Sequence, residues 1–146
     1  LPDRLLDLCR NAAVPPLVNQ VEMHPFCQQV TVLELMRKHD VRAQAWAPFA
    51  EGMRGIFHNE TLVAIGRKYG KTAAQVMLRW NIERGVAVIP KSVHKERIEE
   101  NFRIWDFTLD NADREAIARL DEGRGLILDT LAPSEVERLY AIEDRS

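Results

Sequence analysis

Three short strand-like runs, each followed by a longer helical pattern, constrain the fold of this chain more than any other feature of its sequence. The runs are Leu17–Met23, Val41–Trp46 and Val86–Ile89. The first alternates in the way that is typical of a strand. The last is wholly apolar, as expected where a parallel sheet is covered on its outer side. Parallel neighbours joined through helices favour right-handed crossovers. The sequence therefore predicts the α/β class rather than an all-α fold.

Helix start and stop signals divide the rest of the chain. Asn59 is expected to cap a helix that runs to Tyr69 and ends at Gly70. Thr72, with Gln75 three residues later, is typical of a capping box. Further helical segments are expected at Leu5–Arg10 (a helix end), Gln28–His39, Thr72 to about Arg84, His94–Asn101, after Asp110 with Ile117 and Leu120 facing inward, and after Ser134, where Glu137 completes a second capping-box pattern.

The composition narrows the possible partners. Of the 146 residues, 46% are hydrophobic and 29% charged, and the net charge of −2 gives no reason to expect binding to nucleic acid. Charges interrupt every apolar stretch of the first ten residues, and no stretch reaches the roughly 20 apolar residues of a membrane span. We therefore expect neither a signal peptide there nor a membrane contact. Cys9 and Cys27 form no metal-ligand pair and no disulfide scaffold, so a reducing, cytoplasmic setting and no metal are expected.

The segment Pro90–Asn101 carries the strongest chemical signal. It ends a strand and opens a helix, so an anion there would meet free backbone amides and the positive end of the helix dipole. The Lys91 ammonium and the Ser92 hydroxyl lie in the same turn, and Arg97 follows one helical turn later, within reach of a phosphate or an adenine face. The alternative is a capped surface helix with a common mix of charges, because such charges stabilise almost any helix.

Trp46 ends the second strand-like run, the place where barrel enzymes have their active sites. There its ring can stack on a flat ligand such as nicotinamide. The irregular segment that follows, Ala47–Gly55, is rich in small residues, which would let a pyrophosphate approach the backbone. The alternative is a core Trp whose N–H is satisfied within the protein.

The first strand-like run carries polar residues on both faces. Gln20 and Glu22 point to one face, Asn19 and Val21 to the other. A buried amide such as Gln20 needs partners, which a ligand carboxamide would supply, although Asn19 and Glu22 suit a polar barrel interior equally well. His24 is interpreted as structural rather than as a general base, because no partner carboxylate or nucleophile is identified for it. A Gly-rich phosphate fingerprint is absent from the sequence, so a Rossmann domain is not supported.

Taken together and in this order, VNQVEMHP, AWAPFAEG, TAAQVMLRW and IPKSVHKERIEEN resemble the aldo-keto reductase family, in particular its bacterial 2,5-diketo-D-gluconic acid reductases. The resemblance extends from Leu1 to about Gly123, and the last of these segments is its most specific part. It implies a (β/α)8 barrel that reduces aldehydes and ketones with NADPH by hydride transfer. Such a barrel needs eight strands and about 250 residues. We therefore expect a partial TIM barrel, with the last three βα units and C-terminal helices over 1–123 and a tail with a short helix over 124–146.

The same resemblance assigns roles to individual positions. It implies Gln20 at the nicotinamide carboxamide and Trp46 stacked on its ring; Ala47, Pro48, Phe49, Ala50 and Glu51 along the pyrophosphate; Ala74 beneath the adenine; Lys91, Ser92, Val93 and Arg97 around the 2′-phosphate; and Glu100 and Asn101 at the adenine. The 2′-phosphate site implies NADPH/NADP+ rather than NADH. In relatives the loop after Trp46 more often reads S-P-L-G-x-G, whereas Ala47, Phe49 and Ala50 stand here.

The resemblance also implies that a catalytic group is missing. The family's catalytic Tyr and its Asp, Lys and His partners come from the first four strands, and neither Tyr69 nor Tyr140 matches that motif. The chain also opens without Met in the middle of a leucine pattern, so we expect a C-terminal fragment of a carbonyl reductase without its proton donor. The missing half would leave inward-facing apolar rows uncovered. The alternative is a non-catalytic NADP-binding or interaction module, in which half-barrels associate through their open edges. Loops at Met53–Asn59 and Arg124–Ser146 would shape the pocket for a small carbonyl substrate.

Overall fold

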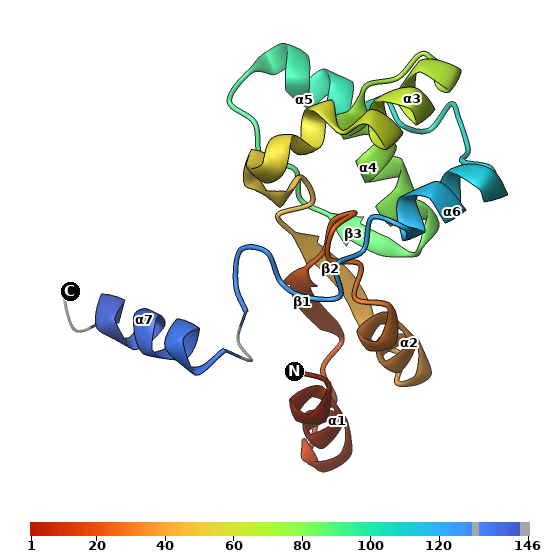
Figure 1. Cartoon of the computed structure of the whole chain (residues 1–146). Helices are drawn as coiled ribbons and strands as arrows, with labels where there is room; N and C mark the ends of the chain where they lie inside the picture. Colours follow the sequence, from red (N-terminus) through yellow and green to blue (C-terminus); the bar gives the residue numbers. More distant parts are fainter. Residues whose placement is uncertain (130–131, 144–146) are drawn as a thin grey trace.

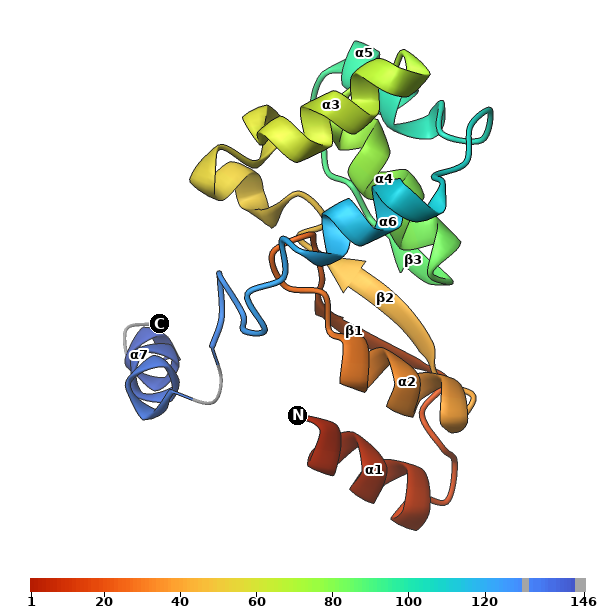
Figure 2. The same ribbon diagram turned by 45° about the vertical axis from the view of Figure 1, so that its right-hand side comes forward.

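The computed structural model describes residues 1–129 and 132–143, shown from two sides in Figures 1 and 2. In chain order the elements are α1 (Pro2–Asn11), β1 (Val18–Glu22), α2 (Val30–Lys38), β2 (Arg42–Trp46), the 3₁₀ segment η1 (Ala50–His58), α3 (Glu60–Tyr69), α4 (Ala73–Glu83), β3 (Val86–Val88), α5 (Lys95–Phe102), α6 (Asn111–Ala118) and α7 (Pro133–Glu143). The strands form one parallel sheet in the order β1-β2-β3. The predicted α/β class and parallel sheet are confirmed.

Helices cover one face of the sheet and leave the other open. Leu5 of α1 and Met36 of α2 pack with Ala43, Ala45 and Val86 of the sheet into one apolar cluster. Figure 2 shows α1 and α2 side by side below the strands. Side chains alternate along a strand, so the opposite face carries Val18, which is 55% exposed, and beyond β3 Ile89, which is 49% exposed. Val18 and Ile89 on this open face are therefore in contact with solvent.

A second apolar cluster joins η1, α3, α4 and α6, which Figure 1 shows gathered at one end of the sheet. Ile56, Leu62, Met77, Leu78 and Ile117 are fully buried within it. Burying one such side chain stabilises a fold by about 1.5–3 kcal/mol. These helices thus form a core of their own beside the sheet.

A close backbone approach fixes the corner between α3 and α4. A Cβ at Gly66 would lie 2.4 Å from the carbonyl oxygen of Lys71, closer than any side chain tolerates. Lys71 in turn donates its backbone N–H to Gly66 O at 2.8 Å. Glycine is therefore required at this position, and the corner sets how α4 begins.

The predicted helix caps are confirmed with one exception. Asn59 accepts from Leu62 N, Thr72 and Gln75 form the reciprocal capping box, and Gly70 has φ +65°. Asp110 caps α6 as predicted, and it also forms a capping box with Asp113, which was not predicted.

The prediction that Ser134 caps the last helix is wrong. α7 begins at Pro133, so Ser134 lies within its first turn. Proline's fixed φ is suited to the first helical position, where its missing N–H costs nothing, and it takes the start of the helix. Both views show α7 away from the sheet and the other helices. The expected tail, 124–146, includes residues 130–131 and 144–146, which lie outside the described residues.

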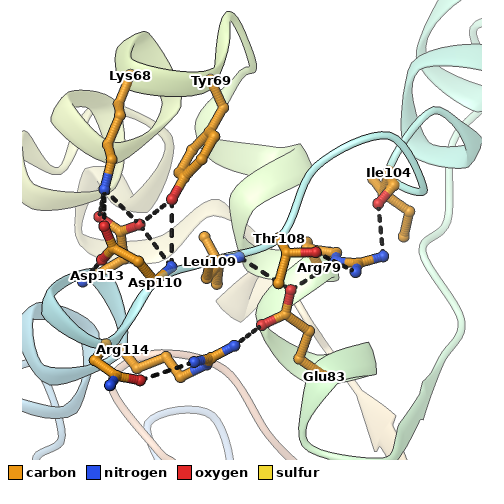
Figure 3. Close-up of polar contacts among 11 residues, drawn as sticks. Lys68, Tyr69, Arg79, Glu83, Ile104, Thr108, Leu109, Asp110, Asp113 and Arg114 are labelled. Carbon is orange, nitrogen blue, oxygen red and sulfur yellow. Dashed lines mark hydrogen bonds and ion pairs between the residues drawn. The ribbon is translucent and has the colours of Figure 1, made fainter.

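A polar network ties α3, α4 and α6 together (Figure 3). The Glu83 carboxylate accepts from Arg79 Nε at 2.7 Å, from Arg114 at 2.9 Å and from the backbone N–H of Leu109 at 3.0 Å. Arg79 also donates to Ile104 O at 3.1 Å, which fixes the chain that follows α5. Glu83 therefore holds α4, α6 and the segment between α5 and α6 in one arrangement.

The other half of this network lies between α3 and α6. Lys68 Nζ lies 3.0 Å from Asp113 Oδ2 and also contacts the Asp110 carboxylate. The Tyr69 hydroxyl donates to Asp113 Oδ2 at 2.5 Å and accepts from Asp110 N at 3.3 Å. Through these contacts the last turn of α3 is joined to the capping box of α6.

In the part of the chain that the structure describes, no helix is long and apolar enough to cross a membrane.

Acid is expected to weaken the network. The Lys68 ammonium lowers the pKa of Asp110 to about 2. Burial alone would raise the pKa of Glu83, but the hydrogen bonds from two arginines and a backbone amide outweigh it, and this pKa is also lowered. Carboxyls with lowered pKa values stabilise the fold above their unfolded values of about 4, and that stability is lost as the pH falls through the folded values. The urea midpoint of unfolding is expected to decrease steadily from about pH 5 to about pH 2.

The variant Glu83→Gln measures what the charge of the Glu83 carboxylate contributes to the stability of the fold. It is expected to lose about 1–3 kcal/mol at neutral pH, because buried charge-assisted hydrogen bonds are weakened, and to show a shallower acid dependence. The matched variant Glu96→Gln changes an exposed carboxylate on α5. It should have the same stability at neutral pH and the same acid dependence as the unaltered chain. Parallel acid profiles for Glu83→Gln and the unaltered chain would contradict this account.

Candidate functional site

The parallel register of β1 and β2 places polar and aromatic side chains abreast at the carboxyl end of the sheet. Gln20 pairs with Gln44, and Glu22 pairs with Trp46. Gln20 Nε2 donates to Gln44 Oε1 at 2.6 Å. Gln20 is exposed and Trp46 is half-buried. The expectation that Gln20 is a buried amide is therefore wrong, because the open face of the sheet leaves it in solvent beside Gln44.

Gln44 was not among the predicted site residues. It lies two residues before Trp46 and hence on the same face of β2. That alternation is the signal in the sequence that would have identified it. Together the two amides and the indole make a polar and aromatic strip along one face of the strand ends.

The turn after Trp46 has unusual backbone geometry. Ala47, Ala50 and Glu51 have φ values of +48°, +48° and +52°, and Gly52 follows at +77°. Left-handed conformations are costly for residues with a Cβ. The family pattern S-P-L-G-x-G has glycine where Ala50 stands, which agrees with the conformation found here.

Burial separates the residues predicted along the pyrophosphate. Pro48 and Ala50 are buried, and Ala50 belongs to the apolar cluster of α3 and α4. Ala47 and Phe49 are half-buried, and the Phe49 ring lies 5.5 Å from that of Phe57. Glu51 is exposed. In this turn a ligand can therefore reach Ala47, Phe49 and Glu51 but not Pro48 or Ala50.

The turn between β3 and α5 gathers cations at the surface. Ser92 Oγ accepts from His94 N at 3.2 Å, and α5 then begins at Lys95, with His94 as its N-cap residue. Lys91 and Arg97 are exposed, and within the described residues neither has a hydrogen-bond or ion-pair partner. The predicted order of strand, turn and helix is confirmed. Val93 lies in the same turn, 74% exposed.

The start of α4 meets the end of α5. Thr72 donates its hydroxyl to Glu100 Oε1 at 2.8 Å, and Gln75 Nε2 donates to Glu100 O at 3.1 Å. Ala74 lies in the first turn of α4 next to these contacts, and Asn101 follows Glu100 on α5. The residues predicted at the adenine thus come from two adjoining helix ends, and Thr72 already occupies one oxygen of Glu100.

The two tyrosines differ in their surroundings. The hydroxyl of Tyr69 is held by Asp113 and by the backbone of Asp110. Tyr140 lies on α7 and is 67% exposed.

His24 is fully buried, and its Nε2 lies 3.0 Å from Glu22 Oε1. The premise that His24 lacks a partner carboxylate is therefore wrong, because residues 22 and 24 meet where β1 ends.

Neither thiol is paired. Cys9 and Cys27 are both free cysteines. Burial, followed by the charges of Glu22 and Asp121, raises the pKa of Cys27 to about 12, which keeps this thiol protonated and unreactive. Over residues 1–129 and 132–143, no three His, Cys, Asp or Glu side chains gather in a way that could hold a metal ion.

Comparison with known proteins gives consistent matches. The sequence profile of the Aldo/keto reductase family matches residues 3–122. Methylglyoxal reductase DkgA of Escherichia coli K12 is 42% identical over 123 residues, which are 84% of this chain and 44% of that protein. The chain therefore spans less than half the length of this curated relative.

Two solved structures have the same fold over most of the chain. The aldo-keto reductase MGS-M4, from a Medee basin deep-sea metagenome, matches with a TM-score of 0.83 and 38% identity over 87% of this chain and 47% of its own. The silkworm (Bombyx mori) aldo-keto reductase AKR2E5, crystallised with NADPH, matches with a TM-score of 0.79 and 35% identity over 84% of this chain and 40% of its own.

Relief of strain in the turn after Trp46 gives a stability test. Glu51→Gly removes a Cβ from an exposed residue at φ +52° and is expected to stabilise the chain by about 0.5–1 kcal/mol. Met53, exposed in the same turn at φ −62°, provides the matched control. Met53→Gly should lower stability instead, because it only adds freedom to the unfolded chain. Urea unfolding measures both, and equal effects would show that φ at residue 51 carries no strain.

Proposed function

The chain belongs to the aldo/keto reductase family, and we propose that it supplies the NADPH-binding part of a carbonyl reductase. The observation that carries this proposal is the turn between β3 and α5, where Lys91 and Arg97 are exposed cations without protein partners among the described residues. Exposed cations beside a hydroxyl and a helix start suit a phosphate monoester, such as the 2′-phosphate that distinguishes NADPH from NADH. The NADPH complex of AKR2E5 agrees with this choice of cofactor.

The remaining predicted residues suit the rest of such a dinucleotide. The first turn of α4, with Ala74, and the end of α5, with Glu100 and Asn101, adjoin one another and would receive the adenine. At the other end Trp46 offers a half-buried aromatic face, and Gln20 offers an exposed amide for the nicotinamide carboxamide. The turn of residues 47–51 would line the pyrophosphate between them through Ala47, Phe49 and Glu51.

When bound, NADPH supplies a hydride to the carbonyl carbon. The task of the residues in this chain is to hold the dinucleotide and to orient its nicotinamide. The Lys91 and Arg97 cations would anchor the charged end, and stacking on Trp46 would set the plane of the ring. The proton for the carbonyl oxygen would come from a Tyr outside these residues, as the family resemblance implies. The substrate would be a small aldehyde or ketone.

Nucleotide binding tests the proposed 2′-phosphate contact. We expect the chain to bind NADP+ more tightly than NAD+ and Arg97→Ala to remove that preference, weakening NADP+ about tenfold or more because a charge-assisted hydrogen bond is lost. Titration calorimetry with both nucleotides measures it. Arg103→Ala is the matched control, since this side chain, 72% exposed at the other end of α5, should leave both affinities unchanged. Equal weakening of NADP+ and NAD+ by Arg97→Ala would contradict the assignment.

A second candidate function, a non-catalytic interaction module, is favoured by the open side of β3. An apolar groove runs along this edge of the sheet, and its lining includes Ile82, Ala87, Val88, Ile98, Phe102 and Trp105. Phe102 and Trp105 are 73% and 58% exposed. Exposed apolar residues beside an unpaired strand edge favour association with another polypeptide.

Light scattering discriminates the two candidates, and an activity assay tests whether the proton donor lies outside these residues. The 146-residue chain by itself is expected not to oxidise NADPH with a panel of aldehydes, since the Tyr69 hydroxyl is held by Asp113 and the family's proton donor is not among these residues. Robust turnover by the chain alone would overturn this expectation. Light scattering that finds only a well-folded monomer would argue against the interaction module.

A further inference from the structure

Glu22 ends β1 with a carboxylate that is only 4% exposed. Its Oε1 accepts from the backbone N–H groups of Leu126 at 2.6 Å and Ile127 at 3.1 Å. Its Oε2 accepts from Leu128 N at 3.1 Å, and His24 Nε2 lies 3.0 Å from Oε1. Successive main-chain N–H groups that converge in this way form a concave binding site for an anion. Here the anion is a side chain more than 100 residues away in the sequence.

The charge state of Glu22 follows from these contacts. Burial alone would raise its pKa, but the hydrogen bonds from His24 and from the amides of Leu126, Ile127 and Leu128 outweigh it, and the pKa is lowered. Glu22 is therefore ionised at neutral pH. An ionised carboxylate without those donors would be costly at this degree of burial, so the loop and the acid require one another.

The path of the loop is built around the carboxylate. A Cβ at Gly125 would lie 2.4 Å from Leu128 O and 3.2 Å from Glu22 Oε2. Any other residue at position 125 would push apart the loop and the acid. Upstream of this loop, Asp121 Oδ1 accepts from Gln28 N at 3.0 Å, and Glu122 N donates to Phe26 O at 2.9 Å. The chain after α6 is thus fixed to the turn after β1 before it reaches Glu22.

The same loop forms part of a groove that runs along β1 and is also lined by α1 and the start of α2. Its lining includes Gln20 and Trp46 from the strands and Arg124, Gly125 and Leu128 from the loop. We propose that Glu22 is a positioning residue, whose carboxylate holds residues 125–128 in place as one wall of the groove that Gln20 and Trp46 also line. Under the proposed function this is the nicotinamide side of the cofactor site, and the inference rests on that function for the identity of the ligand.

The proposal predicts that the loop opens when Glu22 loses its charge. The other titratable or charged residues that face the carboxylate or line the groove are His24 and Cys27 after β1, Asp121 after α6, Arg4 of α1, and Arg124 and Asp129 of the loop. Glu22 is the member of this set that accepts the three amides of 126–128. Protonating or neutralising it should release those amides.

Hydrogen exchange of the complete chain tests the anchor. In Glu22→Gln we expect the amides of 126–128 to lose about tenfold or more of their protection, while amides of α4 stay protected. Glu34→Gln, which neutralises an exposed carboxylate on α2, is the matched control and should leave the loop protected. Unchanged protection of 126–128 in Glu22→Gln would overturn the proposal.

Two further measurements keep the result decisive if Glu22→Gln does not fold. In the unaltered chain, protection of 126–128 corrected for the intrinsic exchange rate should be full at neutral pH. It should be lost on acidification through the lowered pKa of Glu22, before α4 opens. Gly125→Ala keeps the carboxylate but should open the same amides. A loop that remains protected in both experiments until α4 unfolds would overturn the role given to Glu22.

Nucleotide binding separates this inference from the proposed function. Glu22→Gln should bind NADP+ more weakly than the unaltered chain and should bind adenosine 2′,5′-bisphosphate, which lacks nicotinamide, equally well. An unchanged affinity for NADP+ in a variant whose loop has opened would overturn the assignment of the wall. If the unaltered chain binds neither nucleotide, the proposed function fails, while hydrogen exchange still decides whether Glu22 holds the loop.

Discussion

The register between β1 and β2 is the constraint on which the rest of the structure depends. It sets Gln20 beside Gln44 and Glu22 beside Trp46, and a slip of β1 by one residue would turn Gln20 and Glu22 to the helix-covered face. That register is enforced from the other side of the sheet, where the alternate residues Ala43 and Ala45 are buried against α1 and α2. The apolar cluster therefore determines which polar groups reach the open face, although it contributes none of them.

Features with a local cause could be predicted from the sequence. The capping box of Thr72 and Gln75 and the left-handed Gly70 each depend on residues within one helical turn, and the structure has both. The strand, turn and helix around Lys91 follow from the same kind of signal. Contacts between distant segments could not be predicted in this way. Glu22 meets the amides of 126–128 across more than 100 residues, and no periodicity in either segment indicates the other.

Two predictions failed for a related reason. Gln20 was expected to be buried, and His24 was expected to have no acidic partner. The burial of a side chain depends on what covers its face of the sheet. Whether two residues at the end of a strand are in contact depends on how the chain turns there. Helices cover only the opposite face of the sheet, so Gln20 is exposed. The turn after β1 places His24 in contact with Glu22. Strand alternation gives the face of a residue correctly, but it does not give the environment of that face.

The two ends of the proposed dinucleotide site use charge in opposite ways. At the turn between β3 and α5 the Lys91 and Arg97 cations stand in solvent without partners among the described residues, so an anionic ligand can pair with them at little desolvation cost. At the other end the charge of Glu22 is buried and already satisfied by amides of the chain itself, and an ionised carboxylate has no donor to offer a phosphate. A negative charge fixed beside Trp46 would also repel an anion. This distribution favours one orientation of a dinucleotide, with its phosphate monoester at α5 and its uncharged carboxamide near β1.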